Sequence, residues 1–199
     1  MNKIIAVIPA RKGSKGLPSK NILPLKGIPL VKHSILLAKA INLFSKIIVS
    51  TDCEIVAEVA ESIPEVLVVS RPASLAQDHS SVIDVLLHAV ESTHDQGSCG
   101  EISIALLQPT SPFRSVKDIK NAINQYHSDP TCPLVSVTES QQHYLETVLC
   151  TSNGKWVNPP GISYSEGRQN YQFKSYFISG SLYIAQYSFP QETQYIFFS

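Results

Sequence analysis

A short basic segment near the start of the chain has the residue types that bind phosphate. It runs from Pro9 to Asn21, contains glycines at positions 13 and 16, and carries the basic residues Arg11, Lys12, Lys15 and Lys20. Glycines permit tight turns and close backbone approach, and exposed N–H groups in such a loop form a nest for anions. A triphosphate carries about four negative charges, which a nest lined by Lys and Arg can balance. We therefore predict a triphosphate-binding loop.

The loop differs from two familiar phosphate motifs. It lacks G-x-x-x-x-G-K-[ST], and it lacks G-x-G-x-x-G, which disfavours a dinucleotide-binding fold. The alternative interpretation is a basic surface loop. Its place directly after the apolar run at residues 4–8 favours binding, because ligands of parallel sheets lie beyond the carboxyl ends of the strands.

Apolar runs alternate with helical patterns along the chain. Strands are predicted at residues 4–8, 46–50, 66–69, 102–107, 134–137 and near 181–185. Continuous runs of this kind are typical of strands buried on both faces of a parallel sheet. Pro29 is predicted as the first helical residue, directly before the helical pattern of residues 30–40. Helix caps are predicted at Thr51, Ser81 and Ser115, each three residues before an acid. This alternation predicts an α/β fold with right-handed crossovers.

Composition limits the class of protein. The chain has 199 residues and zero formal net charge, which indicates one domain, or one with a small appendage. A chain with balanced charge has no overall electrostatic field that would attract it to nucleic acid or a membrane. No apolar stretch is long enough to span a bilayer. The four cysteines lack zinc-ligand spacing. A reduced, cytoplasmic protein without a signal peptide is the expectation.

Several blocks of the sequence resemble one family. Residues 5–21 look like the signature of the acylneuraminate cytidylyltransferases, the CMP-sialic acid synthetases with their legionaminate and pseudaminate relatives. The resemblance continues in the same order through residues 48–52, 71–78, 83–89 and 107–114. It implies a three-layer, mostly parallel, Rossmann-like sheet of the nucleotide-diphospho-sugar transferase type. It also implies transfer of CMP from CTP to the anomeric hydroxyl of a sialic-acid-type nonulosonic acid, with release of pyrophosphate, for cell-surface polysaccharide or glycan biosynthesis.

The resemblance also assigns residues to roles. The expected catalytic residues are Arg11, Lys15 and Lys20. The expected nucleotide-binding residues are Pro9, Ala10, Arg11, Gly16, Asn21, Arg71, Ser80 and Ser81. The expected sugar-binding residues are Gln108, Arg168 and Lys174. Simpler interpretations stay open: Arg71 as a surface charge, Ser81 as a helix cap alone, Gln108 as part of a turn, and Asp52 and Asp78 as turn formers.

The resemblance divides the chain into three parts. Residues 1–139 would be the nucleotide-binding core, 140–176 an arm that reaches a second subunit, and 177–199 a return strand followed by an incomplete C-terminal part. A homodimer is therefore expected, with Arg168 or Lys174 serving the partner's site. A solvent-exposed loop is the alternative for the arm.

Two features depart from the family pattern. The family holds Mg²⁺ with an Asp-x-Asp motif downstream of the last strand, and this chain contains none, so magnesium is expected without its carboxylates and a truncated C-terminus is suspected. Phe177 and Ser179 stand where the family has Arg and Asn. The alternatives are a catalytically impaired, nucleotide-binding remnant, or a 3-deoxy-manno-octulosonate cytidylyltransferase, which the residues at 14–16 disfavour.

Overall fold

The computed structural model describes residues 3–13, 16–93, 100–142, 146–158 and 174–189. The chain divides into two compact units. The first comprises Met1–Val135 with Gly180–Ser199, and the second comprises Ser136–Ser179. No helix in these described ranges has the length and apolar character needed to cross a bilayer.

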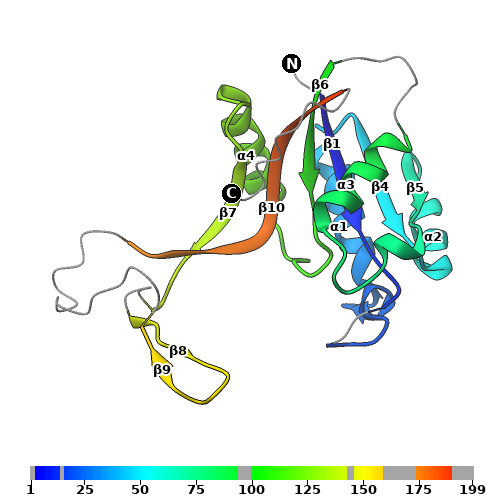
Figure 1. The fold of residues 1–199 in the computed structure, drawn as a ribbon. Helices are drawn as coiled ribbons and strands as arrows, with labels where there is room; N and C mark the ends of the chain where they lie inside the picture. Colours follow the sequence, from blue (N-terminus) through cyan, green and yellow to red (C-terminus); the bar gives the residue numbers. More distant parts are fainter. Residues whose placement is uncertain (1–2, 14–15, 94–99, 143–145, 159–173, 190–199) are drawn as a thin grey trace. The chain divides into compact units, whose positions relative to one another are not determined.

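The main sheet has six strands in the order β5-β4-β1-β6-β10-β7 (Figure 1). In chain order they are β1 (Lys3–Pro9), β4 (Lys46–Thr51), β5 (Val66–Ser70), β6 (Gly100–Leu106), β7 (Leu134–Glu139) and β10 (Tyr176–Phe189). The strands β5, β4, β1 and β6 pair in parallel, and β10 pairs antiparallel with β6. A separate two-stranded sheet joins β2 (Pro24–Leu25) to β3 (Ile28–Pro29). The predicted mostly parallel α/β sheet is confirmed.

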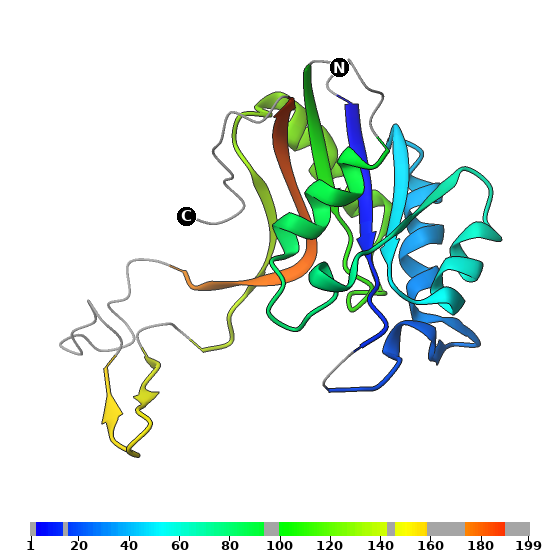
Figure 2. The same ribbon diagram turned by 45° about the vertical axis from the view of Figure 1, so that its right-hand side comes forward.

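Helices cover both faces of the sheet (Figure 2). They are α1 (Leu30–Ile41), α2 (Glu54–Glu61), α3 (Val82–Glu91) and α4 (Val116–Ser128), with two 3-10 turns, η1 (Lys20–Ile22) and η2 (Ala73–Leu75). Side chains of a strand point alternately to opposite faces. Accordingly Ile4 and Ile8 of β1 pack in the core shared with α1, α2 and α4, whereas Ile5 and Val7 pack with α3. The fold therefore has three layers.

The order of the strands creates a crevice. From β1 the chain passes through α1 to β4 and through α2 to β5, moving one way across the sheet, and then returns through α3 to β6 on the other side of β1. Because parallel crossovers are right-handed, this reversal puts α3 on the opposite face from α1 and α2. The loops after β1 and β6 consequently diverge, and ligands of such sheets bind at this switch point.

The helix starts were predicted in part. Ser81 and Ser115 cap α3 and α4, since their hydroxyls accept hydrogen bonds from the amides of Ile83 and Asp118. The prediction at Thr51 was wrong, because Cys53 is the N-cap of α2. Thr51 instead donates to the carbonyl of Ala10 and accepts from the Cys53 amide.

Pro29 was also misplaced by one residue. It has an extended backbone, with φ −54° and ψ 140°, and precedes the first helical residue of α1. The reason is its pairing in the short β2–β3 hairpin, where it lies opposite Pro24.

The second unit contains a short hairpin of β8 (Leu149–Cys150) and β9 (Trp156–Val157). Near its two ends the unit is joined by hydrogen bonds from Ser179 Oγ to Ser136 Oγ (2.8 Å) and from the Ser140 amide to the Ser175 carbonyl (2.8 Å). Ser179 thus has a structural partner, while Phe177 is 55% exposed. The roles predicted for residues 140–176 and 177–199 stay predictions.

One buried polar pair offers a test of the packing between α4 and the sheet. Tyr126 Oη and Ser103 Oγ are 2.9 Å apart, and both residues are almost fully buried. Removing one partner leaves the other unsatisfied, so Tyr126→Phe or Ser103→Ala should each lower the free energy of unfolding by about 1–2 kcal/mol. In urea denaturation the double variant should lose clearly less than the sum. Strict additivity would contradict the pairing.

Candidate functional site

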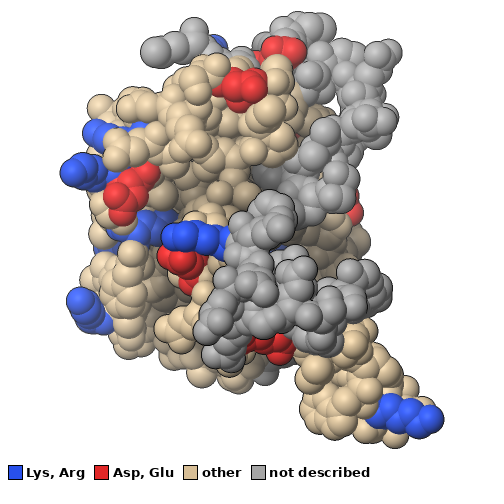
Figure 3. All heavy atoms as spheres, turned by 90° about the vertical axis from the view of Figure 1, so that its left-hand side faces the viewer, with Lys and Arg blue, Asp and Glu red and all other residues tan. Residues whose placement is uncertain are grey.

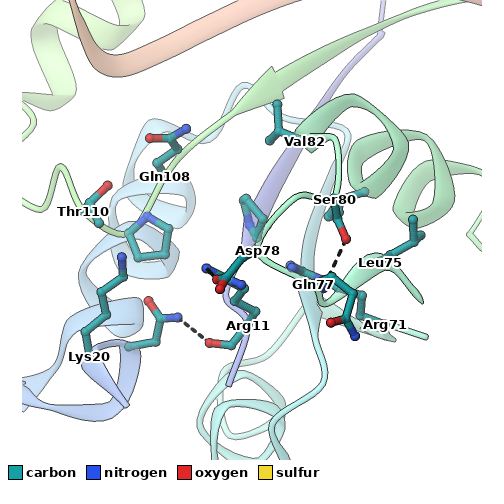
Figure 4. Close-up of a pocket in the computed structure, with 14 residues that line it drawn as sticks. Arg11, Lys20, Arg71, Leu75, Gln77, Asp78, Ser80, Val82, Gln108 and Thr110 are labelled. Carbon is teal, nitrogen blue, oxygen red and sulfur yellow. Dashed lines mark hydrogen bonds and ion pairs between the residues drawn. The ribbon is translucent and has the colours of Figure 1, made fainter. Parts of the chain in front are cut away.

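A cavity of about 260 Å³ lies at the switch point between β1 and β6 (Figure 4). Residues at or after the carboxyl ends of three strands line it, together with the first turn of α3. They are Pro9 at the end of β1, Arg11, Lys20 and Asn21 after β1, Arg71, Leu75, Gln77, Asp78 and Ser80 after β5, Val82 and Val85 of α3, and Gln108, Pro109 and Thr110 after β6. Three of the lining side chains are basic and one is acidic, so the cavity suits an anionic ligand.

The loop after β1 is anchored to β4. The Ala10 amide donates to the Ser50 carbonyl (2.9 Å), and the Ala10 carbonyl accepts from the Thr51 hydroxyl (2.6 Å). One residue further on, the Lys12 amide donates to the Asp52 carboxylate (2.7 Å). These contacts fix the direction in which Arg11 leaves the sheet.

Asn21 closes the other end of this loop. The residue is 5% exposed, and its side-chain amide donates to the carbonyl of Arg11 (2.9 Å). Asn21 also lines the cavity, so the same side chain faces the site and holds the backbone of Arg11. Lys20 lies beside it in η1 and also lines the cavity (Figure 4).

The Arg11 guanidinium reaches across the cavity to the loop after β5. Its Nη2 lies 2.6 Å from the Asp78 carboxylate, and its Nη1 donates to the carbonyl of Ala76 (3.4 Å). Both side chains of the ion pair are partly exposed, so the pair is open to exchange with a ligand. A phosphate entering here would meet Arg11 already turned toward the cavity.

Arg71 is a buried basic residue that lines the cavity. It is 7% exposed, and its guanidinium donates to the hydroxyl (3.2 Å) and the carbonyl (2.6 Å) of Ser50. Burial lowers the pKa of Arg71, the Asp52 carboxylate opposes this shift, and Arg11 adds to it. Arg11 and Arg71 therefore repel one another, and an anion bound between them would relieve that repulsion.

The loop after β5 is held by its own hydrogen bonds. The Ser80 hydroxyl accepts from the Gln77 amide (3.1 Å) and donates to the Ser74 carbonyl (3.0 Å). Gln77 Nε2 also donates to the Ala73 carbonyl (2.8 Å). Leu75 and Val82 add apolar surface to the cavity beside these polar groups, a combination suited to the flat face of a base.

On the opposite side of the cavity, Gln108 and Thr110 face Arg71 and Gln77 across Arg11 and Asp78 (Figure 4). The Gln108 carbonyl accepts from the Ser111 amide (3.2 Å), which closes a turn. The two interpretations of Gln108 are thus compatible, because its backbone closes a turn while the residue lines the cavity.

The structure brings seven of the predicted site residues together around one cavity. They are Pro9, Arg11, Lys20, Asn21, Arg71, Ser80 and Gln108. Ala10 is fully buried and is not among the lining residues, and Ser81 caps α3. A Cβ added at Gly16 would meet no described atom within 4 Å. Lys174 belongs to the second unit, where it pairs with Glu139 (3.4 Å). Lys15 and Arg168 lie outside the described residues.

Several lining residues had no predicted role in the site. Leu75, Gln77 and Thr110 belong to sequence blocks that follow strand ends, so their position offered a signal. For Asp78 the sequence left a turn former and a functional role both open, because its ion pair with Arg11 joins residues far apart in sequence and gives no local signal.

Comparison with known proteins bears on this site. Residues 5–173 match the family model described as cytidylyltransferase. The chain belongs to the cytidylyltransferase family. It is 35% identical to an N-acylneuraminate cytidylyltransferase of Escherichia coli O18:K1:H7 over 98% of this chain and 45% of that protein. It is also 35% identical to the CMP-N,N'-diacetyllegionaminic acid synthase of Legionella pneumophila over 92% of this chain and 78% of that protein.

The curated relatives differ in length from this cytidylyltransferase-family chain, which spans only 45% of the Escherichia coli protein and 43% of a Streptococcus agalactiae one. Among solved structures, a CMP:2-keto-3-deoxy-manno-octonic acid synthetase complexed with CTP aligns with a TM-score of 0.67 at 19% identity. That match covers 92% of this chain and 74% of the other. At such low identity it establishes the fold, and it confirms the predicted Rossmann-like architecture.

The lining of the cavity predicts that the neighbouring residues Arg11 and Lys12 differ in how much they contribute to phosphate binding. Arg11 lines the cavity and Lys12 does not, so Arg11→Gln and Lys12→Gln remove the same formal charge from adjacent positions. Arg11→Gln should weaken binding of inorganic tripolyphosphate by about tenfold or more, because a charge-assisted hydrogen bond is lost. Lys12→Gln should change it by less than about threefold. Isothermal titration calorimetry at fixed salt measures both, and equal losses would argue against a directed role for Arg11.

Proposed function

We propose that this chain carries a cytidylyltransferase activity that transfers CMP from CTP to the anomeric hydroxyl of a sialic-acid-type nonulosonic acid and releases pyrophosphate. The observation that carries the proposal is the cavity in which Arg11, Lys20 and Arg71 converge at the switch point of a cytidylyltransferase-family sheet. On the face in Figure 3, basic and acidic side chains are scattered among other residues, and no broad patch of one sign covers the described surface shown. Together with the formal net charge of zero, the local convergence of basic side chains in the cavity supports an anionic small molecule as the ligand.

The role proposed for each residue follows from its position around the cavity. Arg11, Lys15 and Lys20 are proposed to neutralise the triphosphate, and Asn21 to hold Arg11. Arg71, Ser80 and the backbone near Pro9, Ala10, Gly16 and Ser81 are proposed to surround the nucleotide. Displacement at the α-phosphorus needs in-line placement of the attacking hydroxyl and stabilised charge on the phosphates more than it needs a strong nucleophile. Fixed cations supply that stabilisation without reorganising during the reaction.

The acceptor is proposed to bind at the Gln108 end, where an amide can hydrogen-bond sugar hydroxyls. The names of the relatives, which include a Campylobacter jejuni pseudaminic acid cytidylyltransferase at 26% identity, support a nonulosonic acid. Arg168 and Lys174 are proposed to serve the sugar carboxylate, since Phe177 offers no charge for it. A role in cell-surface glycan biosynthesis and a cytoplasmic location belong to the same proposal.

Magnesium is proposed only on the family resemblance. The described ranges contain no group of three or more His, Cys, Asp or Glu side chains able to hold a metal ion. Asp78 is the single carboxylate among the described residues that line the cavity, and it is paired with Arg11. These residues do not form a magnesium site, so the roles above are assigned without a metal.

Turnover and binding can be separated by experiment. Wild-type protein with CTP, Mg²⁺ and a panel of nonulosonic acids should release pyrophosphate, and EDTA should show whether release needs the metal. CTP should also raise the melting temperature, because it binds the folded state selectively. Stabilisation by CTP without release, with every acid tested, would support the nucleotide-binding remnant instead. Release with 3-deoxy-manno-octulosonate alone would redirect the assignment to that acceptor.

We also propose that the second unit mediates a homodimer. Of the exposed large apolar side chains in the described residues, eight belong to it: Val137, Val148, Leu149, Trp156, Val157, Tyr176, Phe177 and Ile178. Such a concentration of exposed apolar surface is typical of a protein interface. A second copy of this chain fits best, because it would present the same apolar surface in return.

Trp156 provides the test of the homodimer. It is 70% exposed, and large aromatic residues often dominate interface energies. In sedimentation velocity the wild type should be a dimer, and Trp156→Ser should shift it toward monomer. Ile55→Ser, which alters another exposed apolar position (51% exposed) on α2, should leave the dimer intact. A monomeric wild type at tens of micromolar would refute the proposal.

A further inference from the structure

Arg114 occupies a position behind the acceptor end of the cavity and does not line it. Its guanidinium donates in three directions: Nε to the Ser181 carbonyl (2.5 Å), Nη1 to the Ser34 hydroxyl (3.1 Å) and Nη2 to the Gln108 carbonyl (2.5 Å). Those acceptors belong to β10, to α1 and to the segment after β6. A single side chain therefore ties three elements of the first unit together.

The contact with Gln108 is the one that reaches the site. The same carbonyl accepts from the Ser111 amide, so both of its lone pairs are engaged and the backbone of Gln108 has a fixed orientation. The Ser111 hydroxyl in turn donates to the Gly180 carbonyl (3.3 Å). Gly180 has φ +72°, and a Cβ added there would lie 3.6 Å from Gln108 Oε1. The backbone of β10 thus runs directly beside the Gln108 amide.

The electrostatics show that Arg114 is held by its hydrogen bonds and not by an ion pair. Burial lowers the pKa of Arg114 to about 10, so the guanidinium stays protonated at neutral pH. The described residues include no acidic side chain in ion-pair contact with it. A desolvated cation without a counter-ion is costly unless its donors are satisfied. The fixed geometry of a guanidinium can satisfy three diverging acceptors, whereas a Lys ammonium presents one point charge.

We propose that Arg114 is a positioning residue that fixes Gln108 for the acceptor sugar acid. It acts through the Gln108 carbonyl, and its effect belongs to the acceptor end of the cavity and not to the nucleotide end. The assignment of the acceptor to that end rests on the proposed function. The hydrogen bonds that hold Gln108 do not depend on it, which allows the two ideas to be tested apart.

Three variants separate positioning from stability. Arg114→Lys keeps the charge but cannot reach all three acceptors, and Arg114→Gln removes the charge. Ser34→Ala is the matched control, because it deletes one hydrogen bond of the same guanidinium, made by Nη1, and leaves the donor to Gln108, Nη2, in place. Amide hydrogen exchange followed by mass spectrometry should show faster exchange around Ser111 in both Arg114 variants and a rate near that of the wild type in Ser34→Ala.

Steady-state kinetics then give the functional result. In Arg114→Lys the KM for the sugar acid should rise about tenfold while the KM for CTP stays within about twofold, since only one end of the cavity is disturbed. Ser34→Ala should leave both values near those of the wild type, even if its melting temperature falls. A parallel rise in both KM values, or exchange in Arg114→Lys equal to that in Ser34→Ala, would overturn the proposal. So would failure of Arg114→Lys to fold, because the role of Arg114 would then be structural.

If the wild type turns over no acid, the proposed function fails by itself, and the exchange comparison still decides whether Arg114 positions Gln108.

Discussion

The parallel pairing of β1 between β4 and β6 is the constraint on which the site depends. Both neighbours run in the same direction as β1, so their carboxyl ends meet at one edge of the sheet. The right-handed crossover rule then forces α3 to the opposite face from α1 and α2. As a result, the loops after β1, β5 and β6 converge around one cavity, which the first turn of α3 also lines. Every group assigned to ligand binding in the first unit is carried by the last residue of β1, by one of these loops or by the first turn of α3.

Much of this could be predicted from the sequence, because the signals are local. Buried strands such as β1 and β4 are continuous apolar runs, and the caps of α3 and α4 are set by Ser81 and Ser115 within one turn. The rule that ligands lie beyond strand ends pointed to the loop that carries Arg11 and Asn21, and the family resemblance added Gln108 to the same site.

The rest depends on contacts between distant segments, which a linear pattern does not encode. Thr51 has the spacing of a helix cap, yet its hydroxyl is used by the Ala10 carbonyl across the sheet. The strand β10 runs from Tyr176 to Phe189 and so extends beyond the predicted strand near 181–185. The sequence did not predict its first residues as a strand, because they are exposed and lack a period of alternating apolar and polar residues. Arg114 is one basic residue among sixteen in the sequence, and only the fold shows that its donors meet three separate elements.

The ion pair between Arg11 and Asp78 has a further consequence for selectivity. A cavity that held cations alone would act as an ion exchanger and take up any small anion of the surrounding solution. Here the protein supplies its own counter-ion, and an incoming ligand must outcompete a tethered carboxylate 2.6 Å from the guanidinium. A monovalent anion brings no more charge than Asp78 already provides, whereas a polyphosphate engages several basic groups together. Asp78 therefore favours ligands that carry more than one negative charge, because a ligand with a single charge only replaces the attraction that Asp78 already provides for Arg11.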